Sequence, residues 1–402
     1  MEPVGCACHR YQLSIEESLE NCEYFKSLIQ KCHQIAVKIK NNEHWKKILR
    51  NVQNQIYGYP LTIVTSVPTR WFSELSLVER MISISNELYG VISAIATFER
   101  EDMQQNFIDE FSLNQDEIEM LKFFSKIVNI IHVKSCEMSS DTEPTMSMII
   151  PFYKNIIAQL QLELNQLEQN DEVLNVKTYT IKAGGKEYNG YINFEESGMG
   201  EESITEYTAN DNIYFKYTEK KNYIELLIKS LENKMIHLHN IKDNKSMIVS
   251  TVLNPSYRLD FFEDDELEKV KRIFNELLDK NQNEIIDNNN DLGRIQRNKI
   301  FDEYEYYTSE SCVVKSGKID YWLEYWSLNK NRYPKLYELS RKYVCYLGSS
   351  CSLERLFSDS GDTLTPLRSR LLPSHLEELC ILNSYIRSEG IKIFMNIRFD
   401  EE

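Results

Sequence analysis

Apolar side chains recur every three or four residues along most of this chain, and that spacing restricts the chain to a helical fold. The pattern is plainest in the stretches 15–32, 118–131 and 224–238. Residues spaced in this way lie on one face of an α-helix. Asn114 and Glu117 come at the start of the second stretch with the spacing of a capping box, in which each side chain accepts from the other residue's backbone N–H. The spacing predicts a mainly α-helical protein.

Three stretches depart from this pattern. Leu61 to Val67 is short and rich in β-branched residues, and it predicts a single buried strand. Residues 165–215 are polar and acidic; 178–181 and 188–192 could pair as a small hairpin, but the polarity favours a solvated surface loop. Residues 280–315 begin with many Asn and Asp residues and are typical of a linker.

The composition allows a packed core and limits the partners. A hydrophobic fraction of 42% over 402 residues argues against global disorder. A net charge of −16, from 46 basic and 62 acidic side chains, argues against a protein that coats DNA over its whole surface, but it leaves room for a local basic groove. We expect no membrane segment and no secretion signal at Met1 to Tyr11. The nine cysteines are then reduced thiols in the nucleus or cytosol.

The stretch 347–358 combines a helix start with an acidic side chain. Small residues open it at 348–350, where a serine hydroxyl can accept from the free N–H groups of the first turn. Leu353, Leu356 and Phe357 then mark one apolar face. Glu354 lies beside this face in the first turn. On periodicity alone, this is a capped core helix whose glutamate interacts favourably with the helix dipole.

The order of residues from 352 to 379 adds a family resemblance. Residues 352–358 read Ser-Leu-Glu-Arg-Leu-Phe-Ser, and Gly-Asp, Thr-Pro, Arg-Ser-Arg-Leu and Pro-Ser-His-Leu-Glu-Glu-Leu follow in order. This series resembles the C-terminal region of hAT-superfamily transposases. Shorter matches are Cys-x-x-His at 6–9, Thr-Arg-Trp at 69–71, and the stretches 145–151 and 251–258.

The resemblance implies a mainly α fold with a truncated RNase H-like α/β core, a large all-α insertion domain and a C-terminal helical dimerisation region. The partial core would hold the Cys-x-x-His helix, the one strand and the Thr-Arg-Trp block. The expected divisions are 1–80 for the partial core, 81–280 for the insertion domain with a flexible acidic loop at 165–215, 281–317 for a linker, 318–390 for the dimerisation region and 391–402 for a tail.

The resemblance also bears on catalysis. In the family, the glutamate that matches Glu354 is the third acid of a DDE site, whose carboxylates hold two Mg²⁺ ions for DNA cleavage and joining. Neither aspartate of that site has a match, and the only acid before Cys6 is Glu2. A lone glutamate supplies too little charge to hold Mg²⁺. We therefore expect a catalytically incomplete protein that binds no cofactor. Mg²⁺ would be needed only if missing sequence completes the DDE site. The alternatives are a fragment of an active Mg²⁺-dependent transposase and a DNA-binding module without catalysis.

A homodimer is the partnership that the resemblance implies. Pro334 suits the first position of a helix in this region. Aromatic residues there are typical both of a chain's own core and of interface centres, and the sequence leaves these two alternatives open. The residues expected at the interface are Trp322, Trp326, Leu336, Leu339, Leu376, Leu379 and Ile386.

DNA is a further partner that the resemblance allows, and it implies a nuclear location. The candidate DNA-binding residues are Arg355, Arg368 and Arg370, with the lysines Lys38, Lys40, Lys46 and Lys47. No BED-type zinc finger is present to read a DNA sequence. The spacing of possible zinc ligands is poor, so we expect no metal site; these residues are Cys6, Cys8, His9, Cys32 and His33.

Overall fold

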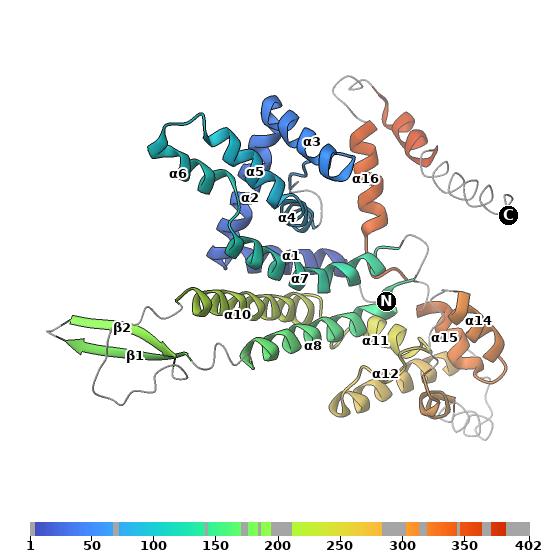
Figure 1. Cartoon of the computed structure of the whole chain (residues 1–402). Coiled ribbons are helices and arrows are strands. Elements are labelled where there is room, and N and C mark those ends of the chain that lie inside the picture. The colour runs from blue at the N-terminus through green and yellow to red at the C-terminus, as the bar shows by residue number, and fades with distance from the viewer. Residues whose placement is uncertain are drawn as a thin grey trace. The chain divides into compact units, whose positions relative to one another are not determined.

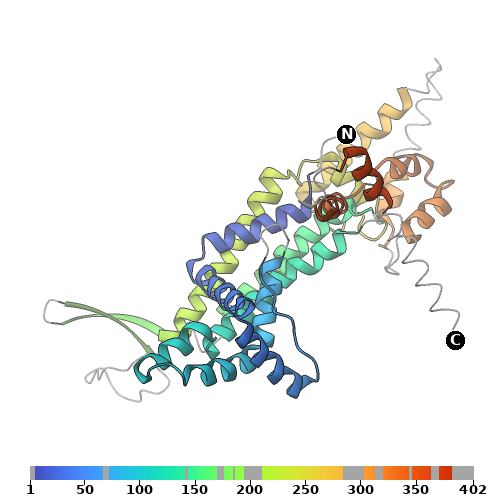
Figure 2. The same cartoon turned by 90° about the horizontal axis from the view of Figure 1, so that it is seen from above.

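The computed structural model of the chain is mainly helical, as predicted (Figures 1 and 2). The structure describes residues 5–66, 72–140, 144–169, 176–183, 186–193, 211–283, 303–312, 320–343, 346–363 and 371–382. Two compact units divide the chain. The central unit holds His9–Ser135 and Pro151–Lys242, and the terminal unit holds Met1–Cys8, Cys136–Ile150 and Asp243–Glu402. Among the described helices, none is long and apolar enough to cross a membrane.

Most helices belong to the central unit. The first residues of α1 and α8 and the last residues of α7 lie in the terminal unit. The elements are α1 (Ala7–Glu20), α2 (Glu23–Asn41), α3 (Glu43–Tyr57), α4 (Ser73–Ser83), α5 (Ser85–Ala96), α6 (Glu101–Phe111), α7 (Gln115–Met138), α8 (Ile149–Glu168), β1 (Val176–Ala183), β2 (Lys186–Asn193), α10 (Asp211–Glu232) and a π-helical turn, η2 (Asn233–Leu238).

The capping box predicted at Asn114 and Glu117 is confirmed at the start of α7. The backbone N–H of Glu117 donates to Asn114 Oδ1 at 2.8 Å, and the backbone N–H of Asn114 donates to Glu117 Oε2 at 2.9 Å. These bonds satisfy donors that have no partner inside the helix. Glu117 also accepts from Lys31 Nζ at 2.7 Å, so the cap joins α7 to α2.

Aromatic rings fill the core of the central unit. Phe25 of α2, Phe124 of α7 and Tyr223 of α10 are buried together, with ring centroids 5.0 to 5.8 Å apart. These separations are typical of favourable aromatic pairs. The three rings join helices that lie far apart in the sequence. Phe25 and Phe124 lie within the stretches 15–32 and 118–131 that showed the clearest helical periodicity, and Tyr223 directly precedes the third stretch, 224–238.

The strand predicted at Leu61–Val67 is wrong for the residues that the structure describes. Residues 61–66 form no strand, and Val67 lies outside the described residues, as does the Thr-Arg-Trp block. The backbone N–H of Leu61 donates to Gln53 Oε1 at 3.1 Å, and Ser66 Oγ lies 3.4 Å from His33 Nδ1. Side chains of α2 and α3 therefore provide the polar contacts that a neighbouring strand would have made.

The acidic segment at 165–215 contains the hairpin that the sequence analysis ranked second. Strands β1 and β2 pair antiparallel, with Val176 opposite Asn193 and Ala183 opposite Lys186 (Figure 1). They are the one sheet in the part of the chain that the structure describes. The expectation of a loop throughout is wrong for these sixteen residues, because alternate backbone pairing does not require an apolar face along its whole length.

The terminal unit contains the remaining helices. Besides the residues that it shares with α7 and α8, they are η1 (Met146–Met148), α11 (Lys245–Val252), α12 (Asp264–Asn283), 303–309, α14 (Asp320–Asn329), α15 (Pro334–Tyr343), α16 (Cys351–Thr363) and 373–382. The linker predicted at 281–317 is wrong for 281–283, the last residues of α12, and for 303–309, which is helical. Glu303 in this helix accepts from the backbone N–H of Lys335 at 3.0 Å and so caps α15, whose predicted start at Pro334 is confirmed.

Candidate functional site

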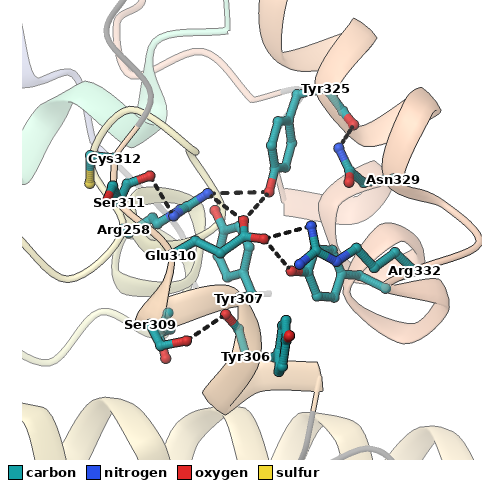
Figure 3. A network of polar contacts seen from close by, with 12 residues as sticks. Arg258, Tyr306, Tyr307, Ser309, Glu310, Ser311, Cys312, Tyr325, Asn329 and Arg332 are labelled. Carbon is teal, nitrogen blue, oxygen red and sulfur yellow. Dashed lines mark hydrogen bonds and ion pairs between the residues drawn. The ribbon is translucent and has the colours of Figure 1, made fainter.

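One carboxylate organises the segment that opens the C-terminal region. Glu310 Oε1 accepts from Tyr333 OH at 2.8 Å and lies 2.7 Å from Arg332 Nη1. Its Oε2 accepts from Arg258 Nη2 at 3.0 Å and from Tyr325 OH at 3.2 Å. Figure 3 shows the carboxylate between the two guanidinium groups. Both oxygens are therefore saturated with donors from α14, from the loop before α15 and from the turn after α11.

Arg258 is the buried partner in this network. Its side chain is 2% exposed, its Nη1 donates to the backbone oxygen of Ser311 at 2.8 Å, and its guanidinium carbon lies 4.8 Å from the ring centroid of Tyr307. A buried charge is tolerated when it is paired and hydrogen-bonded. Burial also raises the pKa of Tyr325 to about 12, so this phenol stays protonated as a donor. The network therefore holds the turn at Arg258 against Glu310 and α14.

Three of the residues expected at a dimer interface are buried in the chain's own core. Trp326 is 2% exposed and its Nε1 donates to the backbone oxygen of Leu253 at 2.9 Å. Leu336 and Leu339 of α15 are buried as well. This burial favours the own-core alternative for these three. The side chain of Trp322 and all of Ile386 lie outside the described residues.

The helix α16 has an apolar face that the described residues leave exposed. Leu353 is 56% exposed, Leu356 36% and Phe357 70%. Their spacing places all three on one side of the helix. The sequence analysis expected a capped core helix here. The cap is confirmed, since Ser349 Oγ accepts from the backbone N–H of Cys351 at 3.1 Å. The prediction that this apolar face is buried in the core is wrong.

The helix 373–382 lies against α16 and adds to its surface. Ser360 Oγ of α16 is 3.0 Å from Cys380 Sγ. Leu376 and Leu379, expected at the dimer interface, are partly exposed, and the neighbouring Ile381 and Leu382 are more than half exposed. We call the exposed apolar side chains of α16 and 373–382 the α16 surface. Large apolar side chains that gather on an exposed surface are typical of an interaction site.

Glu354 lies on α16 and faces solvent. Its Oε1 accepts from Ser350 Oγ at 3.0 Å. No group of three or more His, Cys, Asp or Glu side chains among the described residues could hold a metal ion. A pair of Mg²⁺ ions needs two or three carboxylates, so the residues described here do not fit it.

The structure describes one of the three arginines that were predicted to bind DNA. Arg355 Nη2 donates to the backbone oxygen of Ser139 at 2.6 Å, which directs this guanidinium to the protein. Arg368 and Arg370 lie outside the described residues. Two of the candidate lysines, by contrast, line a pocket.

This pocket lies in the central unit, where the end of α2 and the helix α3 meet residues 60–63. Its volume is about 360 Å³, and its lining includes the cations Lys40, Lys46 and Arg50. Lys46 Nζ is 2.5 Å from Glu43 Oε1, which offsets part of the positive charge. The pocket combines the exposed cations Lys40 and Arg50 and the partly buried Lys46 with a concave surface, an arrangement that suits a phosphate group.

The sequence analysis missed Arg258 and Glu310. Arg258 ends one of the shorter family matches, and its backbone φ of 45° marks an unusual turn that the structure alone reveals. Glu310 falls inside the predicted linker, where an acidic side chain is expected to be exposed to solvent. A signal was present in Tyr325 and Tyr333, whose hydroxyls donate to Glu310, because buried tyrosine hydroxyls require polar partners.

Comparison with known proteins finds two similarities. Residues 303–386 match the model of the hAT family C-terminal dimerisation region. The chain is also similar to the human zinc finger BED domain-containing protein 4, with 20% identity over 408 residues. That alignment covers 94% of this chain and 29% of the relative, so the chain spans less than a third of the relative's length. The matched region begins at the helix 303–309 and includes Glu310 with its partners Tyr325, Arg332 and Tyr333, the helix α15 and the α16 surface, whereas Arg258 lies outside it.

Proposed function

We propose that this chain, which belongs to the hAT superfamily through its dimerisation region at 303–386, is a transposase-derived protein that works by self-association. The observation that carries the proposal is the α16 surface. It places exposed leucine and phenylalanine side chains inside the segment that matches a dimerisation region. A second copy of the chain is the occupant that this match favours. Arg355 of α16 donates to the backbone oxygen of Ser139, and the N–H of Gly348, just before α16, donates to Thr145 Oγ1, so these contacts anchor the start of α16.

The exposed fractions support this role for α16. Complete burial of such a side chain from water is worth about 1.5–3 kcal/mol, and covering the fraction that remains exposed contributes a corresponding share of this. Phe357, the most exposed of the three, is the natural centre of such an interface, since aromatic anchors dominate binding energy. Leu376 and Leu379 on the neighbouring helix extend the same surface.

We further propose that the chain by itself does not cleave or join DNA. Glu354 is solvent-exposed and bonded to Ser350 within its own helix, and the described residues do not provide the carboxylates that two Mg²⁺ ions need. In this proposal Glu354 is the residual third acid of an RNase H-like site. The partial core at 1–80 and the helical insertion at 81–280 belong to the same hypothesis, as does a nuclear location.

Light scattering after size exclusion tests self-association. The wild-type chain at micromolar concentration should have twice the single-chain mass of 47.5 kDa. Phe357→Ser should weaken the dimer at least about tenfold, because each 1.4 kcal/mol lost is a factor of ten. Phe98→Ser is the matched control, since Phe98 is 88% exposed in the central unit outside the matched region.

Two outcomes would contradict the proposal. A monomeric wild-type chain would contradict self-association. Equal effects of the two variants would contradict the role of the α16 surface as the interface. Circular dichroism separates weakened association from misfolding, and Leu353→Ser provides a second variant on the same face. Mg²⁺-dependent DNA nicking or strand transfer that Glu354→Ala abolishes would instead establish the alternative of an active transposase fragment.

The basic pocket favours DNA binding as a second candidate function. Fluorescence anisotropy with a labelled duplex should show affinity that falls steeply with salt, with a slope of about −0.9 for each phosphate neutralised. The triple variant Lys40→Ala, Lys46→Ala and Arg50→Ala should reduce that slope, whereas Lys122→Ala, an exposed lysine on α7, should leave it unchanged. Binding that does not depend on salt, or equal effects of the two variants, would exclude this pocket.

A further inference from the structure

Three cysteines converge where α16 begins. Cys6 precedes α1, Cys8 lies in its first turn, and Cys351 is the first residue of α16. Cys6 Sγ lies 3.6 Å from Ser349 Oγ, and the same hydroxyl contacts Cys351 Sγ. All three belong to the terminal unit, and no disulfide is present among the described cysteines. Residues from opposite ends of the sequence thus form one sulfur cluster.

The backbone around the cluster is held in place. The backbone N–H of Ala7 donates to the oxygen of Gly348 at 3.1 Å, and the N–H of Gly348 donates to Thr145 Oγ1 at 2.9 Å. A Cβ atom at Gly348 would come within 3.0 Å of the Thr145 backbone oxygen, so only glycine fits there without a shift. The close approach of the two chain segments is therefore built into the packing.

The start of α16 also stabilises a thiolate. The backbone N–H of Ser350 donates to Cys6 Sγ at 3.3 Å. Hydrogen bonds from the thiols of Cys351 and Cys8 lower the pKa of Cys6 further, and the same contact with Cys6 raises the pKa of Cys351 to about 11. A cysteine at a helix N-terminus gains reactivity as its thiolate forms. Cys6 is also the most accessible of the three, since Cys8 and Cys351 are buried.

We propose that Cys6, Cys8 and Cys351 form a thiol-oxidation site in which a peroxide converts Cys6 and Cys351 into a disulfide. The Cys6 thiolate attacks one peroxide oxygen, the O–O bond breaks, and Cys6 becomes a sulfenic acid while hydroxide leaves. Cys351 loses its proton to that hydroxide, attacks the sulfenic sulfur and releases a second hydroxide, which takes up a proton from solvent. Two thiols and one H₂O₂ thus give one disulfide and two waters.

This inference is independent of the proposed function. The bond would join residue 6 to the first residue of the helix that carries the α16 surface, and Cys8 is the alternative resolving thiol. Whether or not the chain dimerises, the disulfide either forms or fails to form.

Peptide mapping of the intact chain tests the site. The chain is reduced, freed of reductant and treated with one equivalent of H₂O₂. A linked peptide pair containing Cys6 and Cys351 is expected, and Cys6 should be consumed at least about tenfold faster than the exposed Cys136. Equal rates for Cys6 and Cys136, or the absence of a linked pair, would overturn the proposal.

Variants identify the roles of the three thiols. Cys351→Ser should abolish the linked pair and leave a Cys6 sulfenic acid that dimedone traps, while Cys136→Ser should change neither result. The wild-type measurement stands even if a variant fails to fold. Zinc bound at one equivalent by the purified chain and protecting Cys6 from peroxide would also overturn the proposal, since the sulfurs would then be metal ligands.

Discussion

Arg258 and Glu310 form an ion pair, with 3.0 Å between Nη2 and Oε2, in which the arginine is almost completely buried and the carboxylate is shared with three other donors. The pair joins the turn after α11 to the residue that follows the helix 303–309, inside the segment that matches the hAT C-terminal dimerisation model. Replacing a buried pair can be neutral, but removing one partner leaves an uncompensated charge. Removing one partner of this ion pair should therefore lower stability far more than replacing both.

Glu310→Gln should destabilise the terminal unit by about 3 kcal/mol, because Arg258 would remain buried without a counter-charge. Urea unfolding followed by circular dichroism measures the change. Glu305→Gln is the matched control, since Glu305 pairs with Lys271 at 2.8 Å but is 47% exposed. An exposed pair contributes at most about 1 kcal/mol. Equal midpoints for the two variants would contradict the role assigned to Glu310.

The capping box of α7 gives a second prediction. Asn114→Ala removes the oxygen that accepts from the backbone N–H of Glu117, so the variant should lose about 1 kcal/mol of unfolding free energy. Asn106→Ala, an exposed position inside α6, is the control and should be neutral or slightly stabilising, because alanine is the better helix former. A loss as large at 106 as at 114 would count against the cap.

Local sequence chemistry accounts for what could be predicted. Helix periodicity, the Asn114 cap and the helix starts at Pro334 and Cys351 each depend on residues a few positions apart, and all of them are confirmed. The strand at 61–67 failed because a strand needs a partner that the same seven residues cannot specify. The 61–66 segment contacts Gln53 and His33 instead.

The site required information that periodicity does not contain. Leu353, Leu356 and Phe357 have the spacing of a core face, and only the fold shows that nothing in the described chain covers them. Trp326 and Leu336 have the same kind of pattern and are buried. Sequence spacing identifies an apolar face but does not tell which side of the molecular surface it lies on, so core and interface are indistinguishable at that stage.

Acid should weaken the contact between α7 and α10. Lys216 and Lys220 donate to Glu119 at 2.7 and 2.6 Å, and the bond from Lys216 is the larger cause of a lowered Glu119 pKa. A carboxyl group whose pKa is lower in the folded state adds stability above its unfolded pKa, and this stability is lost as the pH falls through the folded pKa.

Glu119→Gln should therefore be less stable than the wild type at pH 7 and equal to it at pH values well below the Glu119 pKa. The difference at pH 7 should stay below about 1 kcal/mol, because the carboxylate is 46% exposed and screened by solvent. Urea midpoints between pH 3 and 7 provide the measurement. A difference that grows as the pH falls would have the wrong sign for this pair.

Two leucines in the matched region should respond in opposite ways to the same truncation. Leu336 is completely buried and Leu353 is 56% exposed. Leu336→Ala leaves a cavity and should cost about 2–5 kcal/mol of unfolding free energy, while the dimer of the molecules that remain folded keeps its affinity. Leu353→Ala should change stability by no more than about 0.5 kcal/mol, as is usual for a surface position, yet weaken the dimer measurably. Stability is measured at a single protein concentration low enough for the wild type to be monomeric, because dimerisation itself stabilises the folded chain. If Leu336→Ala weakened the dimer and left the fold intact, α15 would be the interface and the α16 surface would not.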